Sequence, residues 1–138
     1  MNIYIFRKVK RMAQKYIVSD VVMYDNKIMV VKEPRDGSHF DLSCPKEGLV
    51  YCFVGVEDIK PVSLTIAILE KNGWELLDCG FYISPNKKGI NVYLPERLDY
   101  PNYSAYSAYT TVLRSNIYTV SDLQHLLFGL GINHEMEV

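Results

Sequence analysis

The chain has 138 residues, a length that suits one compact domain or two very small ones and that needs no disulfides to bury a core. Fifteen Lys and Arg residues stand against sixteen Asp and Glu residues, for a net charge of −1, so the overall charge gives no reason to expect binding to nucleic acid or to an anionic membrane. No segment approaches the roughly 20 apolar residues that cross a bilayer, so we expect no membrane association and a cytoplasmic location.

Residues 1–14 are predicted to be a basic N-terminal extension. Four of five consecutive residues are basic, and they follow an apolar segment at residues 3–6, which is the reverse of the order in a secretory signal. The favoured interpretation is a solvated tail without a role in folding. The alternative is an arm that contacts phosphates or a partner, for which the candidate nucleic-acid-binding residues are Arg7, Lys8, Lys10 and Arg11.

Short β-type segments separated by turn residues fill residues 15–62. Asp25 and Asn26 are placed to form a hairpin turn, and Pro61 ends the regular pairing after a single turn at residues 57–61. The β-branched and aromatic segments themselves lie at residues 16–18, 21–24, 28–31, 39–42 and 49–54. Short strands at this spacing predict a small SH3-like antiparallel β-barrel.

Residues 63–138 are predicted to form an α+β unit. Thr65 can cap a short helix over residues 66–71, and Asn72-Gly73 can end it. Apolar segments typical of strands follow at residues 75–77, 81–83, 90–94 and, after a Tyr-rich loop over residues 95–107, at 109–113. We therefore expect an α+β fold, in which the barrel is followed by a compact α-β-β-β-α unit with its helices on one face of a sheet.

The final helix has the clearest start and stop signals in the chain. Thr119 is a good N-cap, and Asp122 at the third helical position can reach back to a free backbone N–H. Gly131 is placed to end the helix. A single apolar stripe for packing on a sheet is predicted for Val120, Leu123, Leu127 and Leu130.

Two strings in the chain resemble a group of small proteins of gut Bacteroidales and of their phages and mobile elements. The first runs from Ile59 to Thr65 and leads to Leu69-Glu70-Lys71-Asn72-Gly73-Trp74. The second is the final helix, which resembles the pattern Y-V-x-E-L-Q-x-L-x-F-x-L through Tyr118, Val120, Asp122-Leu123-Gln124, Leu126, Phe128 and Leu130. The resemblance covers residues 15–131 and implies no particular activity. The chain departs from the group in its extension before Met12 and in its longer Tyr-rich loop, where a function of its own is expected.

Catalytic and metal-binding patterns are not found in the sequence. The three histidines, His39, His125 and His134, are too far apart for a local metal motif, and neither a nucleophile elbow nor a phosphate loop occurs. The three cysteines have no Cys-x-x-Cys spacing, so we expect reduced, buried thiols at Cys44, Cys52 and Cys79. The sequence thus predicts a protein that is no enzyme and has no cofactor and no metal.

The best binding candidate is the Tyr-rich loop, in which four tyrosines recur at a strict spacing of three. Tyrosines offer rigid amphipathic area for a protein interface or for stacking on a base, but the loop can equally fold back on the sheet with alternate rings buried. With two nearby arginines, the tentative ligand-binding or partner-binding residues are Tyr100, Tyr103, Tyr106, Tyr109, Arg97 and Arg114.

Three functions are compatible with these features. The first is a non-enzymatic binding module of phage or mobile-element origin that acts on a host or phage protein. The second is a sponge that sequesters a nucleotide signal of host defence, with stacking by Tyr103 and Tyr106 and phosphate contacts from Arg97 and Arg114. The third is a nucleic-acid-binding accessory protein that uses the basic extension. A protein partner is favoured, and the fold alone cannot choose among the three.

Overall fold

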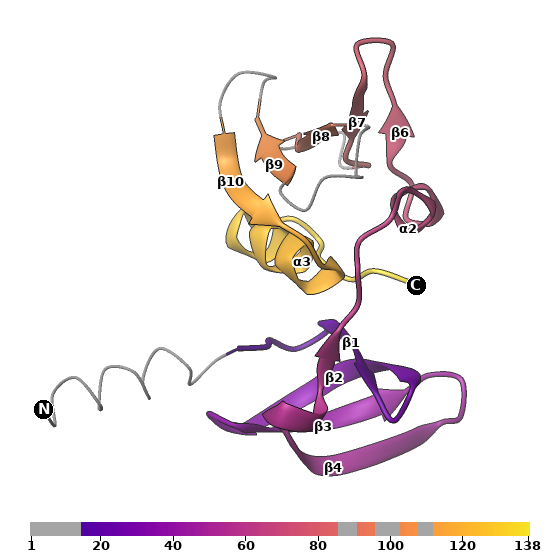
Figure 1. Cartoon of the computed structure of the whole chain (residues 1–138), viewed down its shortest axis with the longest axis vertical. Helices are drawn as coiled ribbons and strands as arrows, with labels where there is room; N and C mark the ends of the chain where they lie inside the picture. Colours follow the sequence, from indigo (N-terminus) through magenta and orange to yellow (C-terminus); the bar gives the residue numbers. More distant parts are fainter. Residues whose placement is uncertain (1–14, 86–90, 96–102, 108–111) are drawn as a thin grey trace, which may run out of the picture. The chain divides into compact units, whose positions relative to one another are not determined.

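The computed structural model describes residues 15–85, 91–95, 103–107 and 112–138. The chain divides into two compact units, Met1–Pro61 and Val62–Val138, called unit 1 and unit 2 below (Figure 1). The predicted basic extension at residues 1–14 lies outside the described residues.

Unit 1 is an antiparallel sheet in which neighbouring strands follow one another along the chain. Its elements are β1 (Val21–Tyr24), β2 (Lys27–Asp36), β3 (His39–Cys44), β4 (Leu49–Gly55), the 3-10 helix η1 (Val56–Asp58) and β5 (Lys60–Pro61). The strand order is β4-β3-β2-β1-β5, so β5 returns to pair with β1 (Figure 1). The hairpin predicted at Asp25-Asn26 is confirmed. Both residues have a positive φ, of 53° and 58°, as the favoured two-residue turn requires.

The predicted closed barrel is not found. Among the described residues, β4 and β5 form opposite edges of the sheet, and no pairing joins them. The 3-10 helix occupies the place predicted for a turn, but β5 contains only Lys60 and Pro61. Proline has no backbone N–H, so this short strand has few hydrogen-bond donors with which to pair another strand.

The core of unit 1 lies on one face of the sheet. Alternate residues of the strands point into it, as the two-residue period of a strand requires. The ring of Tyr16 meets the ring of Phe40 edge to face, with centroids 5.6 Å apart. The buried set consists of Tyr16, Val22, Met29, Val31, Phe40, Leu42, Cys44, Val54 and Ile59. Of the three cysteines predicted to be buried, only Cys44 is, whereas Cys52 and Cys79 are exposed, and all three are free thiols.

Unit 2 is an α+β unit with more strands than predicted. It contains α2 (Ile66–Lys71), β6 (Glu75–Leu76), β7 (Phe81–Ile83), β8 (Tyr93–Pro95), β9 (Tyr103–Tyr106), β10 (Val112–Ile117) and α3 (Val120–Gly129). The strand order is β10-β9-β8-β7-β6, and each strand is antiparallel to its neighbours. The five-stranded sheet replaces the three strands expected from the sequence. Strand β9 lies inside the predicted Tyr-rich loop, because it gains pairing partners on both sides, in β8 and β10.

Helix α3 begins as predicted. The Thr119 side chain accepts a hydrogen bond from the backbone N–H of Asp122, and the Asp122 carboxylate accepts one from the backbone N–H of Thr119. Val120, Leu123 and Leu127 are buried, and the helix packs against β10 (Figure 1). In the described part of the chain, no helix combines the length and apolar composition needed to cross a membrane.

The final segment of the chain is held in place by two side-chain amides. Asn72 and Glu137 exchange two hydrogen bonds of 2.8 Å, from Asn72 Nδ2 to the Glu137 carbonyl oxygen and from the Glu137 N–H to Asn72 Oδ1. The buried Gln124 donates to the carbonyl oxygen of His134 at 2.9 Å. Met136, which lies between His134 and Glu137 in the sequence, is buried. Backbone groups of His134 and Glu137 are thus hydrogen-bonded by the side chains of Gln124 and Asn72.

Candidate functional site

The most unusual backbone in unit 1 is at Phe53 on β4. The pairing of β3 with β4 joins Phe40 to Val54 and Leu42 to Tyr51, so Cys52 and Phe53 together face Asp41 alone. Two residues opposite one define a β-bulge, a feature that redirects a side chain and that is common beside functional sites. Phe53 has φ of +57°, in the left-handed region that bulky residues avoid.

A buried carboxylate holds Phe53 in this conformation. The backbone N–H of Phe53 donates a hydrogen bond to Asp41 Oδ1 at 2.8 Å, and the Asp41 side chain is only 5 % exposed. The other oxygen of Asp41 accepts from Arg35 Nε at 2.8 Å and lies 2.6 Å from Arg35 Nη2. The Arg35 guanidinium first, and the Phe53 N–H second, lower the pKa of Asp41 below its ordinary value. Asp41 is therefore a charged anchor for the bulge.

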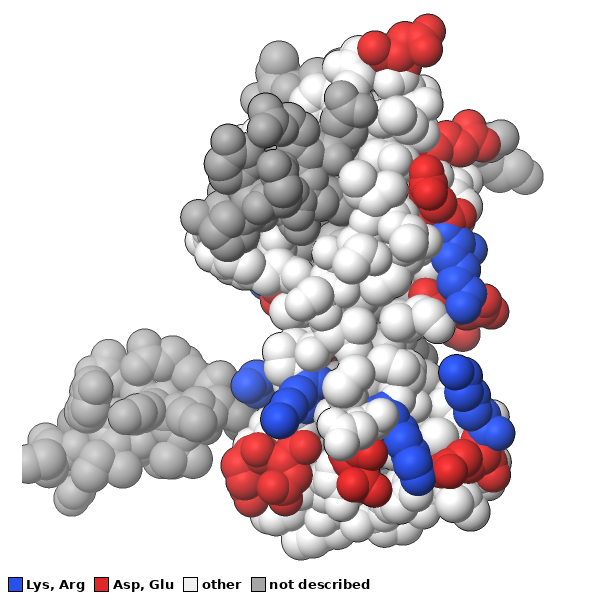
Figure 2. Space-filling view, turned by 45° about the vertical axis from the view of Figure 1, so that its right-hand side comes forward, with Lys and Arg blue, Asp and Glu red and all other residues white. Residues whose placement is uncertain are grey.

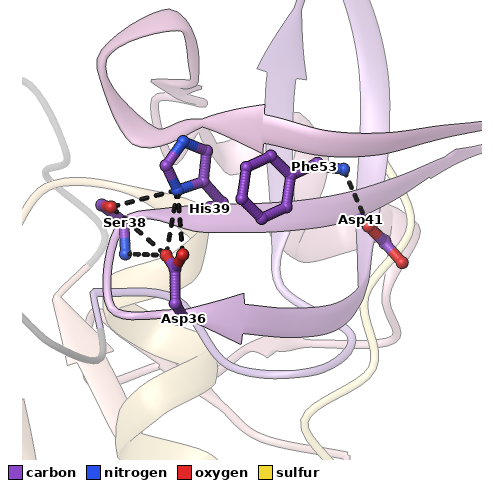
Figure 3. A network of polar contacts seen from close by, with 5 residues as sticks. All are labelled: Asp36, Ser38, His39, Asp41 and Phe53. Atoms are coloured by element: carbon purple, nitrogen blue, oxygen red, sulfur yellow. Dashed lines mark hydrogen bonds and ion pairs between the residues drawn. The ribbon is translucent and has the colours of Figure 1, made fainter.

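The bulge displays the Phe53 ring at the surface. The residue is 56 % exposed, and its ring stacks on the imidazole of His39 with centroids 4.0 Å apart and an angle of 9° between the planes. Figure 3 shows the two rings side by side, with Asp41 at the backbone nitrogen of Phe53. We call the stacked rings of Phe53 and His39 the aromatic platform.

His39 is itself fixed by a turn. Its Nδ1 lies 3.0 and 3.2 Å from the two carboxylate oxygens of Asp36, and the Ser38 backbone N–H donates to Asp36 Oδ1 at 2.8 Å (Figure 3). The Ser38 backbone N–H is the main reason that the pKa of Asp36 is lowered, and the bond from His39 is the second. Because Nδ1 of His39 is engaged with Asp36, Nε2 is the ring nitrogen that is not used in this contact. The platform is thus held from both ends, at Asp41 and at Asp36.

The strand that carries Phe53 is also an exposed edge. Leu49, Val50 and Phe53 are large apolar residues of β4 that remain about half exposed. On its other side, β4 has no strand partner among the described residues. Such an edge offers unpaired backbone N–H and C=O groups to an incoming strand. The site therefore combines backbone pairing capacity, apolar side chains and an aromatic platform.

Charges around unit 1 are partly neutralised in pairs. Lys27 Nζ lies 3.1 Å from Glu47 Oε1, and this hydrogen-bonded contact raises the pKa of Lys27. Arg35 is engaged with Asp41, as described above. Figure 2 shows acidic side chains in the lower part of the view, with basic side chains next to them. A hollow of about 460 Å³ in this unit is lined by Asp25, Glu57 and Asp58, together with Met23, Tyr24, Asn26 and Lys60.

A second hollow, of about 390 Å³, lies in unit 2 beside the final segment. Trp74, Pro85, Leu127, Ile132 and Met136 contribute its apolar side chains, and Asn72 is among the polar ones. The Asn72 amide is already used to hold the chain's own Glu137. No group of three His, Cys, Asp or Glu side chains placed to bind a metal occurs in the part of the chain that the structure describes.

The predicted binding residues of unit 2 are only partly described. Tyr106 ends β9, and its ring meets the Phe81 ring edge to face with centroids 5.7 Å apart. Arg114 on β10 donates to the carbonyl oxygen of Asp122 at 3.0 Å and to Asp122 Oδ1 at 3.3 Å, so its guanidinium holds the first turn of α3. Tyr103 begins β9. The remaining candidates lie outside the described residues, namely Tyr100, Tyr109, Arg97, Arg7, Lys8, Lys10 and Arg11.

The aromatic platform does not follow from the sequence. The spacing of the histidines gives His39 no role, and Phe53 belongs to a segment that reads as a plain apolar strand. No local signal marks the platform, because Asp41 stands between Phe40 and Leu42, where the two-residue alternation of a strand places a polar residue on the solvent side.

Comparisons with known proteins do not add a relative from which a function can be transferred: no family model, curated protein or solved structure matches the chain.

Proposed function

We propose that the protein is a non-enzymatic protein-binding module whose contact surface is the aromatic platform together with the edge of β4. The observation that supports this most is the conformation of Phe53. A bulky residue with φ of +57° carries a strain of about 1–2 kcal/mol, and its ring gains little burial in return because it is 56 % exposed. The strained backbone places the apolar Phe53 ring in solvent, and a partner that covers this ring would explain why the strain is kept.

The proposed mode of binding is addition of a strand. An extended segment of the partner pairs with the free backbone groups of β4, and its side chains pack on Leu49, Val50 and the platform. Main-chain hydrogen bonds supply affinity in this mode, while the exposed rings supply specificity. A stacked and anchored pair of rings loses little conformational freedom on binding, which favours affinity.

Unit 1 is assigned, as part of the proposal, to the SH3-like class. The meander from β1 to β4, the 3-10 helix before β5 and the return of β5 to β1 support this assignment. In this interpretation the sheet is an incompletely closed barrel whose free edge is β4.

The partner is proposed to be a host or phage protein in the cytoplasm. Support comes from the resemblance of the strings at residues 59–74 and 118–130 to proteins of gut Bacteroidales, their phages and mobile elements. The nucleotide sponge and the nucleic-acid-binding protein remain alternatives. Arg114 is already bound to Asp122, and no described contact favours either alternative over the protein partner.

Phe128 provides a matched control for an experiment on Phe53. It is 57 % exposed, and its ring meets that of His134 at 5.0 Å, so it is also an exposed Phe beside a His. It lies on α3 and has no positive φ. The full chain, Phe53→Ala and Phe128→Ala are immobilised separately and exposed to a lysate of a Bacteroidales host.

We expect a discrete protein to be retained by the wild type and by Phe128→Ala but lost with Phe53→Ala. Protection of the β4 amides from hydrogen exchange in the isolated complex identifies the contact surface. Retention by Phe53→Ala, or protection confined to unit 2, contradicts the proposal. Ultraviolet absorbance of the denatured eluate shows whether nucleotide or nucleic acid is retained instead.

A further inference from the structure

We infer that unit 2 has a groove for an extended peptide segment of a partner protein, and that residues 132–138 of the chain fill this groove as an internal competitor. The partner's segment places an aromatic side chain where the chain's own segment places Met136. The inference concerns unit 2 alone and does not rest on the function proposed for the edge of β4.

Residues 132–138, called the internal segment below, lie on unit 2 as a docked peptide does. They leave the end of α3 and run toward α2 without forming a strand (Figure 1). Burial alternates along them: the even-numbered residues are buried or half-buried, whereas Asn133, Glu135 and Glu137 are exposed. A two-residue period is that of an extended chain with one face on a surface.

Side-chain amides of unit 2 hold the backbone of the internal segment. Asn72 exchanges two hydrogen bonds of 2.8 Å with the backbone of Glu137. Gln124 donates to the carbonyl oxygen of His134 at 2.9 Å. Every peptide carries such N–H and C=O groups, so the same two amides can hold another extended segment in place of this one.

The groove is larger than the internal segment that fills it. A hollow of about 390 Å³ remains beside Met136 and is also lined by Trp74, Pro85 and Leu127. Well-packed protein contacts leave few voids larger than a water molecule, so a segment matched to this groove would leave less space. An aromatic side chain in place of the flexible Met136 would fill more of the hollow and could pack against the Trp74 ring.

The internal segment is held by few contacts. Met136 is its one buried side chain, and none of residues 132–138 pairs with a strand. Such a segment opens at a lower cost in free energy than unit 2 unfolds. Its attachment to α3 gives it a high effective concentration, so it competes strongly with an external peptide. Changes that weaken the internal segment should therefore raise the affinity of the groove for that peptide.

The experiment measures binding of fluorescein-labelled peptides to the full chain by fluorescence anisotropy. The peptides carry the sequence of residues 132–138, either unchanged, with Met136→Phe or with Met136→Ser. We expect the Met136→Phe peptide to bind about twofold to tenfold more tightly than the unchanged one. The Met136→Ser peptide should bind about tenfold less tightly. Emission of Trp74, the only tryptophan of the chain, reports whether the peptide enters the groove.

Changes to the internal segment itself should act in the opposite direction. Met136→Ser in the full chain leaves the groove intact, so it should raise the affinity for the Met136→Phe peptide about tenfold or more. Glu137→Pro removes the N–H that binds Asn72 Oδ1 and alters no buried side chain. It should raise the same affinity about twofold to twelvefold, without a change in the core.

Two substitutions in α2 separate the groove from the stability of this helix. Asn72 binds the internal segment, whereas Thr65 caps the other end of α2 by accepting from the Ile68 N–H. Added to the Met136→Ser chain, Asn72→Ala should lower the affinity for the Met136→Phe peptide about fivefold or more. Thr65→Ala should leave it within about twofold, because it removes only the helix cap.

Absence of peptide binding by both the Met136→Ser and the Glu137→Pro chains overturns the inference. Binding that leaves Trp74 emission unchanged, or that Thr65→Ala weakens as much as Asn72→Ala does, also overturns it. A preference for the unchanged peptide over the Met136→Phe peptide contradicts the aromatic residue of the partner. Wild-type dimers that form by exchange of residues 132–138, detected by size-exclusion chromatography, would make a second copy the occupant and overturn the partner peptide.

Discussion

The backbone N–H of Phe53 donates a hydrogen bond of 2.8 Å to the carboxylate of Asp41, twelve residues earlier in the chain. The same carboxylate binds Arg35, six residues earlier still. One buried acid therefore joins β2 to the bulge of β4 and sets the direction of an exposed ring. This relationship gives two predictions, one on backbone strain and one on pH.

The strain at Phe53 is measurable by comparing two substitutions that both remove the ring. Glycine adopts a positive φ freely, whereas alanine retains a penalty of about 1–2 kcal/mol. We expect Phe53→Gly to be more stable than Phe53→Ala by about 1 kcal/mol in urea denaturation. Val50, also exposed on β4 but without a positive φ, is the control. There Val50→Gly should be less stable than Val50→Ala by about 0.5–1 kcal/mol. The same order at both positions would mean that Phe53 is unstrained.

The lowered pKa of Asp41 predicts a loss of stability in acid. Arg35 and the Phe53 N–H favour the charged form in the folded state, so the folded protein binds this proton less readily than the unfolded chain does. The stabilisation is complete above the ordinary Asp value of about 3.9 and is lost as the pH falls below it, through the lower folded-state pKa. Asp41→Asn keeps an acceptor for Phe53 but has no charge to titrate. Between pH 6 and pH 3, its urea midpoint should therefore fall less than that of the wild type. Parallel curves would contradict the role given to Asp41.

Local signals in the sequence were sufficient for the elements that depend on neighbouring residues. The turn at Asp25-Asn26 and the cap at Thr119 need only residues within a few positions of each other, and both are found. Strand β9 depends instead on pairing with β8 and β10, and its Ser and Ala residues gave no local signal for a strand. The barrel was overpredicted because regular strand spacing indicates a meander but does not determine whether its edges meet.

The aromatic platform was beyond prediction for a similar reason. Residues 49–55 read as one apolar strand, and only the register of β4 against β3 creates the bulge that turns Phe53 outward. The contact between Phe53 and His39 joins positions fourteen residues apart, with the turn at residues 45–48 between them. Arg114, predicted to contact a ligand or a partner, donates instead to Asp122 within unit 2 in the described structure.

Burial along α3 predicts a large difference between two apolar residues of one helix. Leu123 is fully buried, so Leu123→Ala should lower the free energy of unfolding by about 2–5 kcal/mol. Phe128 is mostly exposed, and Phe128→Ala should cost less than about 1 kcal/mol. Thermal or urea denaturation of the two variants measures the difference. Similar losses would show that the buried face of α3 is assigned wrongly.

The clamp between Asn72 and Glu137 predicts local, not global, destabilisation. Asn72→Ala removes both hydrogen bonds to Glu137 and the one to the carbonyl oxygen of Ile68. A net contribution of about 0.5–1.5 kcal/mol for a hydrogen bond corresponds to a twofold to twelvefold faster hydrogen exchange at the Glu137 amide. Lys71→Ala is the control, because Lys71 binds only the carbonyl oxygen of Val138 in this segment and leaves the Glu137 amide bonded to Asn72. Exchange at Glu137 that is unchanged in Asn72→Ala, or equally accelerated in Lys71→Ala, would assign the protection to the burial of Met136 instead of to the amide pair.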